Sequence, residues 1–223
     1  MKIKKQLIKL YKNTIGRINN FRIKNKNLTI ISNNCWGGIF YRDNNLKYLS
    51  PTCGLFFIGQ EYIKFIYNLK KYINIDEIKF INVNESKYKD YLNKIQYKGI
   101  NGKIDDLEIC FMHYKTQKEV LEKWNRRKKR INWNNILYKF NDQNYCRYED
   151  LKKFNEFEAD RKICFTAKNY NEFDTIQIKK YEKYEYVLDD IKSYKKYFNM
   201  HKFINMKGKK WKEKFFRDIP LWY

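Results

Sequence analysis

The chain has 223 residues, 43% of them hydrophobic and 18% aromatic, which is enough to build a folded core and excludes general disorder. Its formal net charge of +23 is typical of a polyanion binder, but it also fits a genome whose A/T-rich codons enrich lysine, asparagine, isoleucine, tyrosine and phenylalanine. With only two alanines and two prolines, the sequence favours the second explanation. Lysines and aromatics are spread along the whole chain and no recognised binding module is present, so we do not expect specific nucleic-acid binding.

The cysteines and the hydropathy pattern indicate a cellular location. Five widely spaced cysteines form no C-x-x-C pair, which favours a reducing compartment without a disulfide framework or a structural zinc site. The basic start lacks the apolar run of a signal peptide, and no stretch reaches the roughly 20 apolar residues that a membrane-spanning helix needs. We therefore expect a soluble, cytoplasmic protein.

The first predicted element is an amphipathic helix over residues 3–18. Ile3, Leu7, Tyr11, Ile15 and Ile18 recur at helical spacing, with lysines between them. Such a helix can lie on the anionic surface of the inner membrane as a peripheral contact. Packing on the flank of the domain is the alternative that we favour at this point.

Strands and helices then alternate. The pattern predicts strands over 28–32, 77–83, 107–112, 136–140 and 162–166, and helices over 60–73, 88–95, 117–130 and 148–157. A further strand is expected near 175–178, and the remainder is expected to be mainly helical. This alternation predicts an α/β fold with a layered, mainly parallel or mixed sheet flanked by helices, as one core or two small α/β domains. We divide the chain into the helix 1–27, the α/β core 28–178 and the C-terminal segment 179–223.

The loop after the first predicted strand is the leading candidate for a ligand site. Asn33, Asn34, Trp36, Gly37 and Gly38 follow an apolar run directly, and α/β sheets bind ligands beyond the carboxyl ends of their strands. Amides bind hydroxyl groups, an indole stacks on rings, and glycines permit close backbone approach. A turn whose amides satisfy their own backbone is the competing interpretation.

Two further turns are expected to line the same pocket. Ser50 and Thr52 belong to a turn that could contact phosphate, and His113 and Tyr114 follow the strand 107–112. Histidine side chains titrate near neutral pH, so His113 is the candidate general acid or base, although a lone histidine is more often structural. Cys35 is a weaker candidate nucleophile, because no base lies beside it in the sequence.

The helix 117–130 is specified by a predicted capping box, Thr116 to Glu119, and ends in a basic cluster. Arg126, Arg127 and Arg130 could hold a diphosphate at the rim of the pocket, because guanidinium groups bind phosphate through two parallel hydrogen bonds. A solvated basic face is equally compatible with these arginines. No Walker loop, dinucleotide fingerprint or D-x-D pair is present, and the adjacent aspartates 105–106 and 189–190 do not form a natural chelating pair.

Several of these motifs together resemble a bacterial family. They are Ser32-Asn33-Asn34-Cys35-Trp36-Gly37-Gly38, Ser50-Pro51-Thr52-x-Gly54-Leu55-Phe56, His113-Tyr114-Lys115 and Lys123-Trp124-x-Arg126-Arg127-x-x-Arg130-Ile131-Asn132. In this order they resemble the domain-of-unknown-function family nineteen-nineteen, whose members are often labelled exopolysaccharide or capsule biosynthesis proteins. The resemblance implies an α/β fold and a link to surface polysaccharides, and it brings no catalytic residue.

The sequence therefore predicts a protein of surface-polysaccharide biosynthesis that transfers or modifies a sugar on a phosphate-bearing donor. The expected partner is a sugar nucleotide or a phosphorylated glycan, and the sequence requires no cofactor and no metal. A non-catalytic binding or scaffold protein of the same pathway is the alternative.

Overall fold

The structure, a computed structural model, describes residues 2–206, with the backbone alone for residues 2–10 and 12. It confirms the α/β fold. The helices are α1 (Lys2–Arg22), α2 (Trp36–Asp43), α3 (Gly59–Tyr67), α4 (Leu69–Asn74), α5 (Lys89–Lys94), α6 (Gln117–Lys128), α7 (Tyr148–Glu156), α8 (Asp190–Ser193) and α9 (Met200–Asn205). The strands are β1 (Thr29–Ser32), β2 (Lys79–Ile81), β3 (Ile100–Ile104), β4 (Leu107–Phe111), β5 (Ile136–Asn141), β6 (Lys162–Thr166) and β7 (Ile176–Gln177). Short 3₁₀ turns occupy Val83–Glu85, Lys179–Tyr181 and Tyr194–Lys196.

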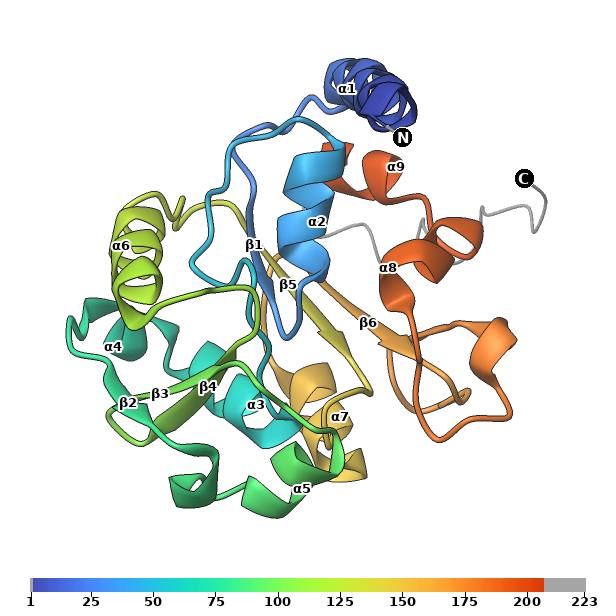
Figure 1. The fold of residues 1–223 in the computed structure, drawn as a ribbon. Helices are drawn as coiled ribbons and strands as arrows, with labels where there is room; N and C mark the ends of the chain where they lie inside the picture. Colours follow the sequence, from blue (N-terminus) through green and yellow to red (C-terminus); the bar gives the residue numbers. More distant parts are fainter. Residues whose placement is uncertain (1, 207–223) are drawn as a thin grey trace.

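A parallel sheet forms the centre of the molecule, with the strand order β1-β5-β6-β7 (Figure 1). Successive side chains of a strand point to opposite faces, so each strand contributes to two cores. Ile31 and Phe140 pack in a first core with α3, α4, α6, α7 and β4. Ile30 and Leu137 pack in a second core with α2 and the segment 178–206. Lys139 lies two residues after Leu137, so its side chain points to the same face of the sheet, the one that faces the second core.

Two of the predicted strands, 77–83 and 107–112, do not belong to the parallel sheet. β2 and β4 pair with β3 in a separate antiparallel sheet of order β2-β3-β4. β3 and β4 are joined only by Asp105 and Asp106, with Asp105 at a φ of 55°. A parallel crossover needs roughly a dozen residues or more, so this connection permits only a hairpin.

The segment 54–58 links the two sheets. Phe56 forms an antiparallel bridge with Cys110 of β4, and the Phe57 amide donates to the Asn33 carbonyl at the end of β1 over 2.9 Å. This link holds the end of β1 close to the end of β4. The loops that follow these two strands are therefore neighbours in space.

Helix α2 was missed, because Gly37 and Gly38 indicated a loop. An added Cβ at Gly37 would lie 3.0 Å from Ile30 Cγ2 and 3.3 Å from Ser32 Cβ, so glycine lets the helix pack directly on β1. The helix expected over 60–73 is divided at Asn68 into α3 and α4.

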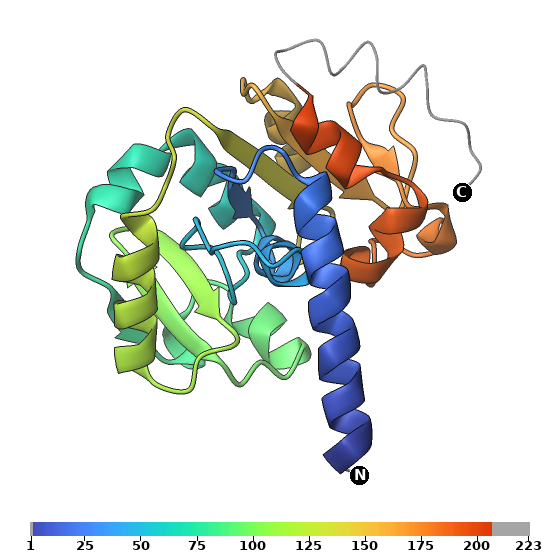
Figure 2. The same cartoon turned by 90° about the horizontal axis from the view of Figure 1, so that it is seen from above.

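The two ends of the described chain lie on the same side of the parallel sheet. The segment 178–206 packs in the second core through Val187, Phe203 and Ile204, whereas residues 207–223 of the predicted C-terminal segment lie outside the described residues. Helix α1 extends well beyond the body of the molecule (Figure 2). Among the described helices, none is long and apolar enough to cross a membrane.

Candidate functional site

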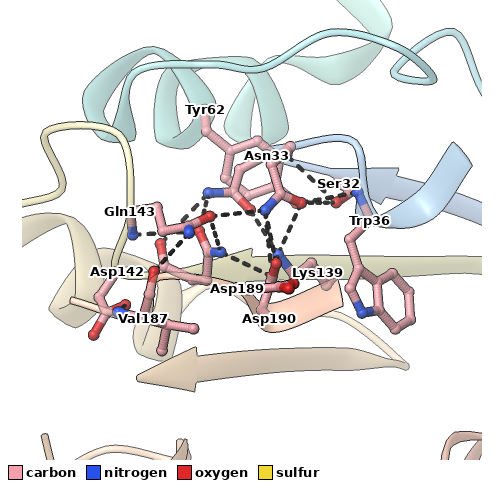
Figure 3. A network of polar contacts seen from close by, with 12 residues as sticks. Ser32, Asn33, Trp36, Tyr62, Lys139, Asp142, Gln143, Val187, Asp189 and Asp190 are labelled. Atoms are coloured by element: carbon pink, nitrogen blue, oxygen red, sulfur yellow. Dashed lines mark hydrogen bonds and ion pairs between the residues drawn. The ribbon is translucent and has the colours of Figure 1, made fainter. Parts of the chain in front are cut away.

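Polar side chains gather at the carboxyl edge of the parallel sheet. Asn33 and Asn34 follow β1, Asn141 ends β5, Gln143 comes two residues later, and Asp190 begins α8 (Figure 3). All except the half-buried Gln143 are buried. This is the edge at which open α/β sheets place their ligand sites.

A lysine–aspartate ion pair forms the centre of this network. The Lys139 side chain is 0% exposed and the Asp190 side chain 1%, and their Nζ and Oδ2 atoms form an ion pair. Lys139 Nζ also donates to Asn33 Oδ1 over 3.2 Å and to Asn34 Oδ1 over 3.0 Å. Burial lowers the pKa of Lys139, and the Asp190 charge opposes this shift.

The amides around the pair satisfy one another. Asn34 Nδ2 donates to Asp190 Oδ1 and to Gln143 Oε1, both over 3.1 Å, and Asn141 Nδ2 donates to Asp190 Oδ2 over 2.8 Å. Asn33 Nδ2 donates to Asn141 Oδ1 over 2.7 Å. The network therefore joins the ends of β1 and β5 to α8, and its buried amides are bound to protein groups.

A second carboxylate fastens the C-terminal segment to this edge. Asp142 accepts from the backbone amides of Ala167 and Val187 over 2.6 and 2.8 Å. Burial raises the pKa of Asp142 to about 6, and these two hydrogen bonds oppose the rise. The Asp142 carboxyl is therefore protonated more readily than an ordinary aspartate.

An open cavity of about 410 Å³ lies beside this network, between α2, α6 and the turns around residues 48–54 and 113–114. This volume is in the range of small-molecule sites, roughly 300–1,000 Å³. The lining residues come from four segments of the chain and are mostly basic, aromatic or small. They are Cys35, Gly38, Ile39, Arg42, Tyr48, Cys53, Gly54, His113, Tyr114, Lys123 and Arg127.

Arg127 holds one wall of the cavity in place. Its Nη1 atom donates to the Cys53 carbonyl over 2.8 Å and to the Tyr114 hydroxyl over 2.9 Å. The Tyr114 hydroxyl donates to the same carbonyl over 2.6 Å, and the guanidinium lies 5.0 Å from the centre of the Tyr48 ring. Burial raises the pKa of Tyr114 to about 12, so its phenol is neutral at physiological pH.

The other basic side chains of the cavity are more accessible. Arg42 is exposed and pairs with Asp43 over 2.9 Å, and Lys123 pairs with Glu119 one turn earlier in α6. His113 is exposed at the turn after β4. Within the described part of the chain, the residues that line this cavity include no carboxylate.

The Cys35 thiol is poorly suited to act as a nucleophile. Burial and the Asp190 carboxylate raise its pKa to about 11, and the Lys139 charge opposes this only in part. The group is therefore a neutral thiol at physiological pH. Among residues 2–206, no cluster of three or more histidine, cysteine, aspartate or glutamate side chains could hold a metal ion.

A family model described as "Domain of unknown function (DUF1919)" matches residues 6–212, which include both the polar network and the cavity. The chain belongs to this family. The match confirms the family resemblance. An "Uncharacterized protein" of Haemophilus influenzae (strain ATCC 51907 / DSM 11121 / KW20 / Rd) is 28% identical over 223 residues, covering 100% of this chain and 96% of the relative.

The structure does not bring all the predicted site residues of this DUF1919 protein together in one place. Gly38, His113, Tyr114 and Arg127 line the cavity, so three of the predicted segments meet there. Asn33 and Asn34 lie in the network, and Trp36 and Gly37 are buried.

Ser50 and Thr52 lie in the turn that precedes the cavity wall. Both are buried, and their hydroxyls lie 2.9 Å apart. Thr52 Oγ1 also accepts from the Ser32 amide over 3.1 Å, which ties the turn to β1. Arg126 is exposed, and Arg130 is half-buried and donates to the Tyr48 carbonyl over 3.4 Å. Neither Arg126 nor Arg130 is among the residues that line the cavity.

Four residues of the network were not predicted as site residues from the sequence: Lys139, Asn141, Gln143 and Asp190. One signal was present: Lys139 is a lone charge within the apolar strand 136–140. Because lysine is abundant throughout the chain, this one lysine did not stand out. Arg42 and Lys123 were concealed in the same way.

Proposed function

We propose that this DUF1919 protein binds a phosphate-bearing sugar donor in the cavity beside α6 and transfers or modifies the sugar in surface-polysaccharide biosynthesis. The observation that carries the proposal is the lining of the cavity. Arg42, Lys123 and Arg127 converge there, and the carboxylates that pair with Arg42 and Lys123 are not among the described lining residues. Such a surface attracts anions, and guanidinium and ammonium groups bind phosphate oxygens directly.

The remaining lining groups fit the rest of such a donor. The Tyr48 and Tyr114 rings offer apolar surfaces against which a sugar or base ring can pack, and Gly38 and Gly54 leave room for close approach. Gly54 has a φ of 87°, a conformation that other residues rarely adopt. The polysaccharide pathway itself is suggested by the label that members of the resembled family often carry.

In this proposal His113 acts as the general base. An acceptor hydroxyl forms a bond to the anomeric carbon of the sugar while the bond from that carbon to the phosphate oxygen breaks. His113 takes the hydroxyl proton, and the phosphate leaves with the bonding electron pair beside the basic groups. Arg127 already holds the Cys53 carbonyl and Tyr114, so it positions the wall and offers its charge without rearrangement.

A binding role without turnover is the second candidate, and one observation favours it. The cavity lining offers no carboxylate within the described residues, and the neutral Cys35 thiol is a poor nucleophile. General-base chemistry would then depend on His113 alone. The same cavity would recognise the donor for a partner enzyme.

A ligand screen followed by a turnover assay tests the proposal. A panel of nucleotide sugars is screened by thermal shift, because a ligand at 100 times its dissociation constant adds about 2.7 kcal/mol of stability. Each hit is then assayed for sugar transfer or hydrolysis with the parent, His113→Ala and Met112→Ala. Met112 is the exposed neighbour outside the cavity and serves as the control.

The two candidates give different results. Loss of turnover in His113→Ala, with Met112→Ala unchanged, supports the enzyme. A shift without turnover supports the binding protein. No shift with any member of the panel contradicts both.

A further inference from the structure

Helix α1 exposes an apolar stripe to solvent. Tyr11, Ile15, Ile18 and Phe21 have between 36% and 85% of their surfaces exposed. At about 3.6 residues per turn, these positions share one side of the helix. Large apolar side chains exposed singly are ordinary, but a continuous stripe on a projecting helix marks an interaction surface.

A different side of α1 fastens the helix to the body. Gly16 is buried, and an added Cβ there would lie 3.6 Å from the Asp43 carbonyl. Asn20 Nδ2 donates to the carbonyls of Asn44 and Asn45 over 3.1 and 3.0 Å. These contacts lie at the end of α2, and they leave the apolar stripe turned away from the protein.

The charge of α1 indicates what covers the stripe. Its sequence contains five lysines and two arginines and no acidic residue. The described basic side chains, Arg17 and Arg22, are exposed. A soluble partner helix would ordinarily present its own charges of both signs, whereas an anionic bilayer offers a continuous negative surface above an apolar interior.

We propose that α1 docks the protein on an anionic lipid bilayer, with Tyr11, Ile15, Ile18 and Phe21 inserted at the headgroup boundary and the basic side chains on the lipid phosphates. The helix lies in the plane of the interface. Ile39 and Arg42 of α2 line the cavity, and α1 is fastened to the end of that same helix, so docking brings the cavity close to the lipid surface. The proposal does not depend on what the cavity binds.

Vesicle co-sedimentation of the full chain tests this proposal. The vesicles are phosphatidylcholine alone, or phosphatidylcholine mixed equally with phosphatidylglycerol. The parent protein is expected to sediment with the anionic vesicles, to remain in solution with the neutral ones, and to be released as salt is raised. The double variant Ile18→Ser/Phe21→Ser should weaken binding on the order of tenfold to a hundredfold, because exposed apolar groups no longer enter the bilayer.

Further variants separate the contribution of charge from that of apolar insertion, and thermal unfolding checks that the variants remain folded. Arg17→Gln should weaken binding about fivefold, whereas Lys183→Gln, at an exposed lysine elsewhere, should not change it. Tyr184→Ser/Tyr186→Ser removes two exposed aromatic side chains outside α1 and should bind like the parent. Thermal unfolding midpoints equal to that of the parent show that the α1 variants remain folded.

Three results would overturn the proposal. The first is a parent protein that stays in solution with both kinds of vesicle. The second is equal sedimentation of the parent and Ile18→Ser/Phe21→Ser. The third is a concentration-dependent dimer that this double variant abolishes while lipid binding is absent, which would show that a second copy covers the stripe.

Discussion

Replacing Lys139 by methionine tests the buried network most sharply. Methionine preserves most of the apolar stem but removes the ammonium group that pairs with Asp190 and donates to Asn33 and Asn34. The carboxylate of Asp190 would then remain buried without its counter-ion. Asp190→Asn is the complementary change, because it leaves the Lys139 ammonium without its partner.

The burial of the pair sets the expected magnitude. Both side chains are almost fully inaccessible, at 0% and 1% exposure. Removing one member of a buried ion pair costs about 3–5 kcal/mol, a large share of the roughly 5–15 kcal/mol that stabilises a folded domain. The double variant Lys139→Met/Asp190→Asn leaves no uncompensated charge. We therefore expect it to lose about 2–3 kcal/mol less than the sum of the single variants.

Urea unfolding of the four proteins measures this cycle, with the free energy extrapolated at constant m value. Lys71→Met is the control, because Lys71 and Asp105 form an ion pair whose side chains are about half exposed, and its midpoint should match that of the parent. A cost of less than about 1 kcal/mol for Lys139→Met, or simple additivity of the two single variants, would contradict a coupled buried ion pair.

Three further predictions concern single positions. Burial raises the pKa of Asp142 from 3.8 to about 6, so the folded protein retains a proton that the unfolded chain releases, and stability falls as pH rises through that window. Asp142→Asn should remove this contribution, and the stability difference between parent and variant should change by about 2 kcal/mol between pH 4 and 7 in urea titrations. Tyr62→Phe removes a buried hydroxyl that donates to a β1 carbonyl over 2.7 Å, so the free energy of unfolding measured in urea should fall by about 1–2 kcal/mol. An unchanged free energy of unfolding would contradict that hydrogen bond. Gly59→Ala places a Cβ 2.8 Å from Cys146 Cα and should lower the free energy of unfolding by about 1–3 kcal/mol. Gly16→Ala is the control, because an added Cβ there meets only ordinary contacts and should not lower the thermal midpoint. Equal midpoints for the two variants would contradict the crowding at Gly59.

The parallel sheet could be predicted because its strands are short apolar runs at regular intervals. Fully buried strands of this kind are easily recognised in a sequence, and Thr29–Ser32 and Lys162–Thr166 are examples. Their partners did not follow from the same pattern, because periodicity says nothing about which strands pair. β3 was not predicted, because the polar or small residues Asn101, Gly102 and Lys103 are typical of a loop. It is nevertheless the middle strand of the antiparallel sheet.

The residues that meet at the candidate site could be predicted in part from the sequence, and their hydrogen bonds could not. Loops that follow strands gather at one edge of an α/β sheet, and this rule brought His113 and Gly38 to a common cavity. Asp190 pairs with a residue 51 positions earlier, so only the folded chain shows that the Asp189–Asp190 pair contributes to the network. The capping box was predicted with a small error of register: Thr116 accepts from the Glu119 amide, but the Glu119 carboxylate accepts from the Lys115 amide.

A calorimetric titration decides whether the cavity beside α6 binds a phosphate-bearing sugar donor. The strongest hit of the nucleotide-sugar panel is titrated into the parent, Lys123→Ala and Lys118→Ala. Both lysines belong to α6, but only Lys123 lines the cavity, while Lys118 is exposed to solvent. We predict that Lys123→Ala weakens binding about tenfold, the loss expected for one charge-assisted contact, and that Lys118→Ala binds like the parent. Equal affinity of all three proteins, or no binding by any of them, would contradict the assignment of the donor to this cavity.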